Sequence, residues 1–583
     1  MQQSTKVIFI FITFIVLLFG VLTRYSYVAF SDREINRVIL KDREKASRGS
    51  IITADGYKIA YTRKVYTATV NTRDIPKNNE NIFAQMFSLY SNMSKDNILD
   101  KIRSKSGSVT LATNLTFQEY QGIKELSREF RSSGILIGKT NSKGEYKYIG
   151  LSIFETGAER QYPYGDILTP FIGYTNKFIE ARYGQVKGIK GLERRFEQDM
   201  KPANDGYLRG YKDVRGNIIL NSSIERKEKV DGLDIHLNID VSIQKRIEIL
   251  LSKKQKDFGS KQIIASVMES DTGNIIAIAT TNRFIRKYLK DVSLLNIDAV
   301  EYIFEPGSVI KPVIYSLLLD EKKIRRGQHI DCENGKYRIG RKVITDEHPM
   351  KLIPVEKVII ESSNIGMAKL VKDFEAVDYY NGLKRFGFAQ RTGLEVGREV
   401  VGSINSVKEL SRHIYRATTS YGYGITVNFV QLLKAYNIFN NDGIMVNPKA
   451  VSYLKNGEVL ISDIERSSPI EDGLRILSSS TSRKIKNILV RTVKEGTGRS
   501  ANMIGLEIGG KTGTAHIAEN GGYSKRYHSS FFGFANDKDR KYTIGVTVIE
   551  PQIGKHFASQ TAAPIFKAIV NILVDDNYLK KYY

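Results

Sequence analysis

The sequence of 583 residues predicts a multidomain α+β protein with one N-terminal transmembrane helix. An uncharged apolar run at residues 7–23 is long enough to cross a bilayer. Two pairs of apolar runs, within 263–279 and 531–549, each flank a short turn, which is typical of β-hairpins. These hairpins enclose a helical middle, which predicts an antiparallel sheet covered by helices in the C-terminal part.

The apolar run is expected to be an uncleaved anchor that follows a cytoplasmic tail at residues 1–6. No small-residue cleavage site follows the run, which argues against a signal peptide. Lysine and arginine are more frequent after the run than before it, which by itself favours an inside location for the rest. Long domains translocate largely regardless of such charges, so this count does not decide the orientation.

Residues 24–230 are predicted to form a β-rich structural module, because short apolar runs alternate with polar turns over 48–230. A polar segment at 221–230 marks the boundary to a second domain at 231–583. We expect helices at 24–47, 81–89, 116–128, 241–252 and 563–573, and strands at 66–70, 134–138 and 233–239.

Composition excludes few function classes. The chain is 41% hydrophobic and 26% charged, as in a globular protein, and its net charge is +25. No nucleic-acid recognition module accompanies this charge, and a basic exported domain beside anionic lipid and wall polymer explains it equally well. Cys332 is the only cysteine, which rules out an internal disulfide framework and predicts a free thiol near a loop.

Three short motifs in one order point to a serine acyltransferase site. Ser308 and Lys311 form S-x-x-K, Ser362 and Asn364 form S-x-N, and Lys511 opens a K-T-G-T motif. Each motif alone is weak, because 452–455 also fits the first and 403–405 also fits the second.

The first motif pairs a nucleophile with a base. Ser308 follows a Pro-Gly pair and precedes an apolar helical pattern, so it lies near a helix N-terminus with Lys311 on the same face. A serine hydroxyl needs a base to take its proton, and lysine serves only if its pKa falls through desolvation or a neighbouring cation. Lys511 is a candidate for that cation. A capping serine with a surface lysine is the plain alternative.

The other two motifs supply substrate contacts. In the site interpretation Ser362 relays a proton and Asn364 orients a substrate amide, whereas helix capping is the alternative. The third motif reads as an edge strand in which Lys511, Thr512 and Thr514 bind a carboxylate. Gly513 is expected to let the substrate backbone come close.

A phosphate-binding loop is a rival interpretation of the third motif. Residues 505–512 formally fit G-x-x-x-x-G-K-[ST]. That loop requires a helix to open at the lysine, and no helical spacing follows Lys511. We therefore disfavour a nucleotide-binding site.

The three motifs together resemble the penicillin-recognising serine family, which comprises penicillin-binding proteins, serine β-lactamases and β-lactam sensors. The chain resembles class B penicillin-binding proteins most closely. In the catalytic part the resembling stretches are 305–308, 363–366, 495–498, 510–515 and 561–566. In the part that resembles their elongated, dimerisation-type pedestal they are 48–51, 160–165 and 188–193. Residues 53–55 depart from the family pattern at a pedestal turn. Residues 420–424 and 562–566 resemble the septal, cell-division type.

This resemblance implies a peptidoglycan D,D-transpeptidase outside the bacterial cytoplasmic membrane. Ser308 would attack the penultimate D-Ala carbonyl of a stem peptide, and β-lactams would acylate the same serine. It implies no metal or organic cofactor and no nucleic acid, but a SEDS-type glycosyltransferase and division-complex proteins as partners. An elongation-type transpeptidase, a β-lactam sensor, a β-lactamase and a non-catalytic scaffold remain as alternatives.

Overall fold

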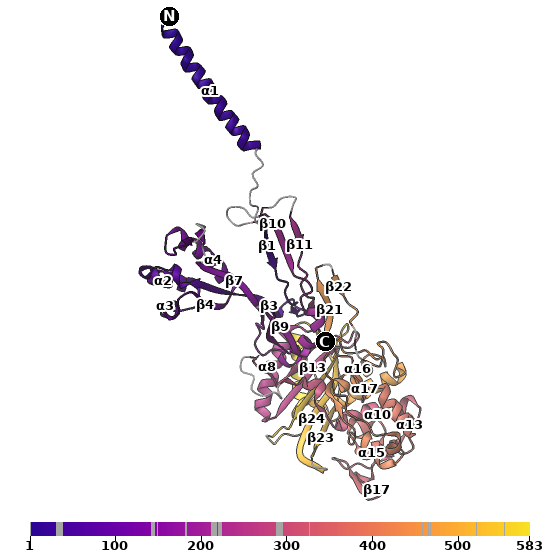
Figure 1. Cartoon of the computed structure of the whole chain (residues 1–583). Coiled ribbons are helices and arrows are strands. Elements are labelled where there is room, and N and C mark those ends of the chain that lie inside the picture. Colours follow the sequence, from indigo (N-terminus) through magenta and orange to yellow (C-terminus); the bar gives the residue numbers. More distant parts are fainter. Residues whose placement is uncertain are drawn as a thin grey trace. The chain divides into compact units, whose positions relative to one another are not determined.

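The computed structural model describes residues 2–30, 39–140, 146–147, 150–180, 183–211, 218–219, 224–286, 295–325, 327–457, 459–464, 466, 468–519, 522–552 and 554–582. The chain divides into two compact units (Figure 1). The smaller unit comprises residues 1–46 and 203–230, and the larger one comprises 47–202 and 231–583. Residues 212–217 and 220–223, which include the start of the polar segment at 221–230, lie outside the described residues.

The smaller unit contains an apolar helix and a small sheet. Helix α1 runs over Gln2–Phe30, and its segment Lys6–Phe30 is long and apolar enough to span a membrane. The apolar part of this segment is not buried against the rest of the described chain. Strands β1 (Ile39–Glu44), β10 (Gly206–Tyr211) and β11 (Glu225–Lys227) form an antiparallel sheet. The helix predicted for 24–47 is therefore wrong at β1, because the backbone of residues 39–44 pairs with β10.

A long mixed sheet organises residues 47–202 of the larger unit. Its strand order is β22-β21-β12-β2-β3-β7-β9-β8, with β4 also paired to β3. The bounds are β2 Ile51–Ile52, β3 Lys58–Asn71, β4 Ser108–Leu115, β7 Leu151–Gln161, β8 Tyr174–Glu180, β9 Tyr183–Lys190, β12 Asp234–Leu237, β21 Val451–Asn456 and β22 Val459–Ile461. Strands from the predicted catalytic part thus complete this sheet.

Three helices cover one end of this sheet and enclose a separate core. They are α2 (Glu80–Tyr90), α3 (Lys95–Ser104) and α4 (Phe117–Ser132), close to the ranges predicted for α2 and α4. The strand predicted at 134–138 is wrong. There the chain turns after α4, and the N–H of Leu136 bonds to the carbonyl of Phe130, which inserts Leu136 into the core.

A buried ion network joins three segments that are distant in sequence. Glu193 accepts a hydrogen bond from Arg48 at 3.0 Å and another from Arg160 at 2.7 Å, and all three side chains are at most 1% exposed. Burial alone would raise the pKa of Glu193, but the guanidinium groups of Arg160 and Arg48 hold it below the usual value. The three pedestal-like motifs therefore meet at one carboxylate.

The catalytic part is built on a five-stranded antiparallel sheet in the order β14-β13-β25-β24-β23. Its strands are β13 (Gln262–Glu269), β14 (Ile275–Thr280), β23 (Glu507–Glu519), β24 (Gly522–Asn536) and β25 (Lys541–Ile549). Both predicted hairpins are confirmed: β13 pairs with β14, and β24 pairs with β25.

Helices cover this sheet, as predicted, and they lie on both of its faces. Phe531 packs on Phe566 with ring centroids 4.7 Å apart, whereas Phe532 packs on Phe429 at 5.1 Å. Consecutive strand residues point to opposite faces, so α18 (Ala562–Asp575) and α16 (Phe429–Asn440) lie on different sides. Helix α8 (Val241–Phe258) packs on the α18 side and is longer than predicted.

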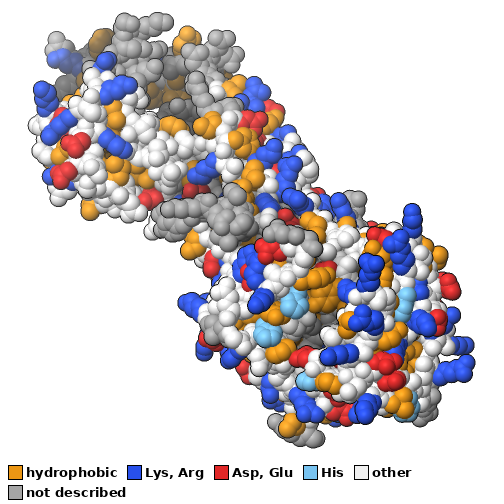
Figure 2. Space-filling model, turned by 90° about the horizontal axis from the view of Figure 1, so that it is seen from below, with side chains coloured by type: hydrophobic (Ala, Val, Ile, Leu, Met, Phe, Trp, Pro, Cys, Tyr) orange, Lys and Arg blue, Asp and Glu red, His pale blue; other side chains and the backbone are white. Residues whose placement is uncertain are grey.

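The remaining helices form two groups in sequence, one that precedes the first hairpin and one that lies between the two hairpins. They are α5 Thr169–Ile172, α6 Gly191–Arg195, α7 Glu197–Met200, α9 Asp298–Glu301, α10 Lys311–Asp320, α11 Lys357–Ile360, α12 Asn364–Leu370, α13 Ala376–Arg385, α14 Val407–Leu410, α15 His413–Ser420 and α17 Ser479–Lys494, of which α5 to α7 belong to the pedestal side. Figure 2 shows lysine and arginine side chains spread over one face and interspersed with acidic ones.

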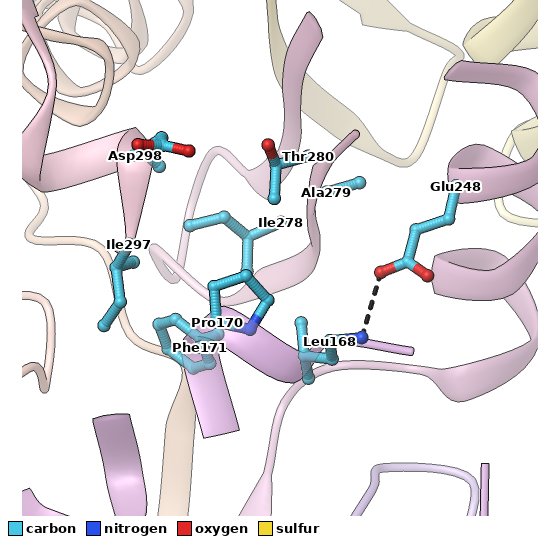
Figure 3. A pocket seen from close by; sticks show the side chains of 10 residues that line it. Leu168, Pro170, Phe171, Glu248, Ile278, Ala279, Thr280, Ile297 and Asp298 are labelled. Atoms are coloured by element: carbon cyan, nitrogen blue, oxygen red, sulfur yellow. Dashed lines mark hydrogen bonds between the residues drawn. The ribbon is translucent and has the colours of Figure 1, made fainter. Parts of the chain in front are cut away.

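A pocket inside the larger unit is lined by α5, α8, β14 and α9 (Figure 3). The backbone N–H of Leu168 donates to Glu248 Oε1 at 3.0 Å, and Arg283 approaches the other carboxylate oxygen at 3.3 Å. Asp298 lines the pocket from the far side (Figure 3). Burial raises the pKa of Glu248 to about 7 despite Arg283.

This raised pKa predicts a pH-dependent stability. Between pH 4.5 and 7 the folded protein binds a proton at Glu248 that the unfolded chain has released, so stability falls as pH rises through this window. The full effect corresponds to about 3 kcal/mol. We expect Glu248→Gln to flatten the dependence of the melting temperature on pH between 4.5 and 7. An unchanged pH profile in this variant would show that Glu248 ionises normally.

Candidate functional site

The K-T-G-T segment lies on an edge strand, as predicted. In the part of the chain that the structure describes, β23 pairs with β24 alone and leaves its other side open to an added strand. The strand continues past Lys511 to Glu519 without a helix. This geometry excludes the phosphate-binding loop, and it leaves Lys511, Thr512, Gly513 and Thr514 on one extended segment.

Ser308 lies on a tight helical turn packed against this strand. The 3₁₀ turn Gly307–Ile310 leads directly into α10, and Gly307 has φ +58°, a conformation that favours glycine. A Cβ atom on Gly513 would stand 2.8 Å from Val309 Cγ1. The missing side chain of Gly513 therefore makes room for the nucleophile turn, and its expected role in admitting the substrate backbone stays a prediction.

Lys311 is fully buried behind the serine and extends toward the second motif. Its Nζ donates to the Ser362 carbonyl at 2.6 Å, to Ser362 Oγ at 3.2 Å and to Asn364 Oδ1 at 2.8 Å. Among the described residues, no hydrogen bond joins it to Ser308. Burial lowers the pKa of Lys311 to about 7, although the nearby Asp346 and Glu347 raise it.

The second motif combines a strained serine with a capped helix. Ser362 has φ +65°, unusual for a residue with a side chain, and this presents its carbonyl and hydroxyl to Lys311. Ser363 caps α12 by accepting a hydrogen bond from the N–H of Gly366. The helix cap is therefore Ser363, next to Ser362, which contacts Lys311. Asp346 accepts from Ser363 Oγ at 2.6 Å and from the N–H of Asn364 at 2.6 Å.

Lys511 is buried and hydrogen-bonded to its own strand. Its Nζ donates to the Thr512 carbonyl at 3.0 Å and lies 3.5 Å from Thr497 Oγ1. Burial, and then the charge of Lys311, lower the pKa of Lys511 well below its usual value. Of the two causes considered for Lys311, burial is the one that lowers its pKa. A bound carboxylate would favour the charged form of Lys511.

The three motifs meet at one cleft of about 300 Å³. Five of the eight predicted site residues line it, and the remaining three, Lys311, Lys511 and Gly513, lie behind its wall. Sequence analysis assigned no role to the other residues that line it, which are Glu347, His348, Tyr421, Tyr423, Thr497, Phe557, Ala558 and Ser559. Thr497 lies in the resembling stretch 495–498, and its Oγ1 accepts from Thr512 Oγ1 at 2.8 Å.

The competing motif matches do not form a site. Ser452 and Lys455 lie on strand β21, where residues three apart point to opposite faces. Ser403 pairs with Thr426 in an isolated bridge. Cys332 is a free thiol, as predicted, and it is fully buried, 3.4 Å from Ser363 Oγ.

The arrangement provides the parts of covalent acyl transfer. A cleft exposes a serine hydroxyl at the first turn of a helix, and a lysine whose pKa is near neutral lies one turn away. The opposite wall offers threonine hydroxyls on an open strand edge, which suits a peptide ending in a carboxylate.

Comparisons with known proteins agree with this chemistry. Residues 263–571 match the penicillin-binding protein transpeptidase domain, and residues 43–237 match the penicillin-binding protein dimerisation domain. The chain is 30% identical to "Probable peptidoglycan D,D-transpeptidase PenA" of Neisseria meningitidis serogroup A over 433 residues, which is 73% of this chain and 70% of the relative. It is 26% identical to "Stage V sporulation protein D" of Bacillus subtilis over 578 residues, 96% of this chain and 84% of the relative.

A solved structure shares the fold. Penicillin Binding Protein 2X from Streptococcus thermophilus superimposes with a TM-score of 0.74 and 20% identity, over 93% of this chain and 82% of that chain. The transpeptidase match alone spans more than half of the sequence. The chain therefore belongs to the class B penicillin-binding proteins, the family of serine-type peptidoglycan D,D-transpeptidases.

Proposed function

We propose that this protein cross-links peptidoglycan stem peptides through an acyl-enzyme on Ser308. Ser308 Oγ attacks the penultimate D-Ala carbonyl, and neutral Lys311 takes the hydroxyl proton. Ser362 relays that proton to the nitrogen of the terminal D-Ala, which leaves as the peptide C–N bond breaks. An amine of a second stem peptide then replaces the ester with an amide.

The substrate roles follow from the walls of the cleft. Thr512 and Thr514 line the cleft and hydrogen-bond the terminal carboxylate, and Lys511, buried behind them, supplies the opposite charge. Asn364 orients the substrate amide. Gly513 acts indirectly, because it lets the Ser308 turn approach the strand. The observation that carries the proposal is the buried Lys311, whose pKa is near 7 and whose amine contacts both members of the second motif.

Fluorescent penicillin tests the nucleophile. We expect the soluble part, about residues 25–583, to take up a label that persists for hours on a denaturing gel, because a transpeptidase deacylates slowly. Ser308→Ala is expected to show no label while keeping its melting temperature, since Ser308 Oγ makes no hydrogen bond among the described residues.

The same experiment separates the alternative classes. Label that appears and then disappears within minutes would favour a β-lactamase. A folded wild-type protein that takes no label would overturn the proposal and favour a scaffold. Persistent label with no cross-linking of stem peptides would favour a sensor.

We further propose a septal role in the bacterial cytoplasmic membrane. Helix α1 would anchor the chain, with the pedestal (24–230) and the catalytic domain (231–583) outside. The 26% identity over 430 residues to "Peptidoglycan D,D-transpeptidase FtsI" of Buchnera aphidicola supports the division type over the elongation type. A SEDS-type glycosyltransferase and division-complex proteins are the expected partners. Filamentous cells on depletion would support this role, whereas rounded cells would indicate elongation.

A further inference from the structure

The catalytic cleft contains an acidic side chain that has no counterpart of opposite charge on the donor substrate. Glu347 is the only acidic residue among the described residues that line the cleft, alongside Ser308, Ser362 and Asn364. The donor peptide brings a carboxylate of its own, which a second carboxylate would repel. Glu347 therefore calls for a cationic ligand in a second part of the cleft.

The position of Glu347 is fixed by its neighbour. Asp346 accepts hydrogen bonds from Ser363 Oγ, from the N–H of Asn364 and from the N–H of Ile365 at 3.0 Å, which pins the loop to the start of α12. Glu347 follows directly and is exposed. Its carboxylate has no hydrogen-bond or ion-pair partner in the described part of the chain, so it is free to take a ligand.

Electrostatics place this carboxylate close to the reacting groups. The charge of Glu347 raises the pKa of Lys311 and that of Lys511, against the lowering caused by burial. The threonine hydroxyls of the cleft suit an anionic group, and the carboxylate of Glu347 suits a cationic one. Transpeptidation uses two substrates with these opposite charges at their reacting ends.

We propose that Glu347 binds the acceptor amine of the second stem peptide as an ammonium ion beside the acyl-enzyme. This inference rests on the proposed function and assigns the acceptor side of the cleft. The bound ammonium loses one proton to water, and the free amine attacks the ester carbon. The bond from that carbon to Ser308 Oγ breaks, an amide bond forms, and the second proton passes through Lys311 to Ser308 Oγ.

Partitioning of the acyl-enzyme tests this assignment. A D-alanyl thioester serves as donor, D-alaninamide as cationic acceptor and methanol as neutral acceptor. We expect Glu347→Gln to lower aminolysis relative to hydrolysis by about tenfold, the loss of one charge-assisted hydrogen bond. Its acylation rate and its ratio of methanolysis to hydrolysis should stay at the wild-type values, and Glu347→Asp should recover part of the aminolysis.

Glu361→Gln is the matched control. Glu361 also raises the pKa of Lys511 but does not line the cleft, so this variant should keep the wild-type partition. Unchanged aminolysis in Glu347→Gln would overturn the inference. An equal loss of acylation and aminolysis would also overturn it, because Glu347 would then act by setting the pKa values of Lys311 and Lys511. A folded wild-type protein that the thioester does not acylate at Ser308 would instead overturn the proposed function and the inference with it.

Discussion

Replacing Lys311 with methionine is expected to lower the rate of acylation by penicillin by about 10³-fold to 10⁴-fold, the upper range for loss of a general base. Methionine keeps the length and apolar volume of the buried side chain, so the fold should persist. The amine that contacts Ser362 and Asn364 is lost, and with it the proton acceptor for Ser308. Stopped-flow acylation with a fluorescent penicillin measures the effect.

The wild-type pH profile provides an independent check on Lys311. Its amine is a base only when neutral, so the acylation rate should rise with pH and level off above about 7. A rate that is still rising steeply at pH 9 would contradict the lowered pKa.

Lys434 is the matched control for a buried lysine. Burial lowers its pKa to about 8, but its Nζ donates to Asn447 Oδ1 at 2.5 Å, and it does not line the cleft. Lys434→Met is expected to change stability and to leave acylation within a factor of about two, whereas general bases act by 10²-fold or more. Equal losses of acylation in the two variants would point to a shared structural cause.

Removing the buried carboxylate of Glu193 is expected to destabilise the larger unit by about 3–5 kcal/mol, because Arg160 stays buried without its carboxylate and Arg48 keeps only Glu197. Glu193→Ala should therefore unfold at lower urea concentration and be cleaved faster by protease. The matched control is Glu159→Gln, which breaks partly exposed pairs with Arg63 and Lys177 and should cost at most about 1 kcal/mol.

The sign of the pH effect at Glu193 is opposite to that at Glu248. The pKa of Glu193 is lowered in the folded protein, so its contribution is present above pH 4.5 and is lost as pH falls through the lowered value. Acid should therefore destabilise the wild type more than Glu193→Ala. A parallel loss of stability in both proteins would show that the network is not linked to protonation.

Local patterns were sufficient for the elements that the sequence placed well. Apolar runs on either side of a short turn predicted both hairpins of the five-stranded sheet, because a turn between two such runs is a local pattern. The same reasoning failed at 134–138 and at 39–44, where position in the chain and pairing partners overrode it. Leu136 belongs to an apolar run but is buried by a turn after α4.

The sequence predicted which residues belong to the candidate site, and the structure added which of them contact one another. The motifs identified Ser308, Lys311 and Lys511, since the chemistry of acyl transfer restricts residue type and spacing. They did not reveal that Gly513 faces the Ser308 turn, nor that Thr497 bonds to Thr512. Those facts depend on which segments pack together, and no short motif encodes that.

The sequence alone therefore determined the class of chemistry, the order of the motifs and the family, because each depends on residue identity along a short stretch. The tertiary structure decided the burial, the pKa and the contacts of the functional side chains. Desolvation of Lys311 requires the surrounding fold, and so do the meeting of Arg48 and Arg160 at Glu193 and the exposure of Glu347 in the cleft. Burial and long-range charge arise only when distant segments come together, and these set the pKa values on which the mechanism depends.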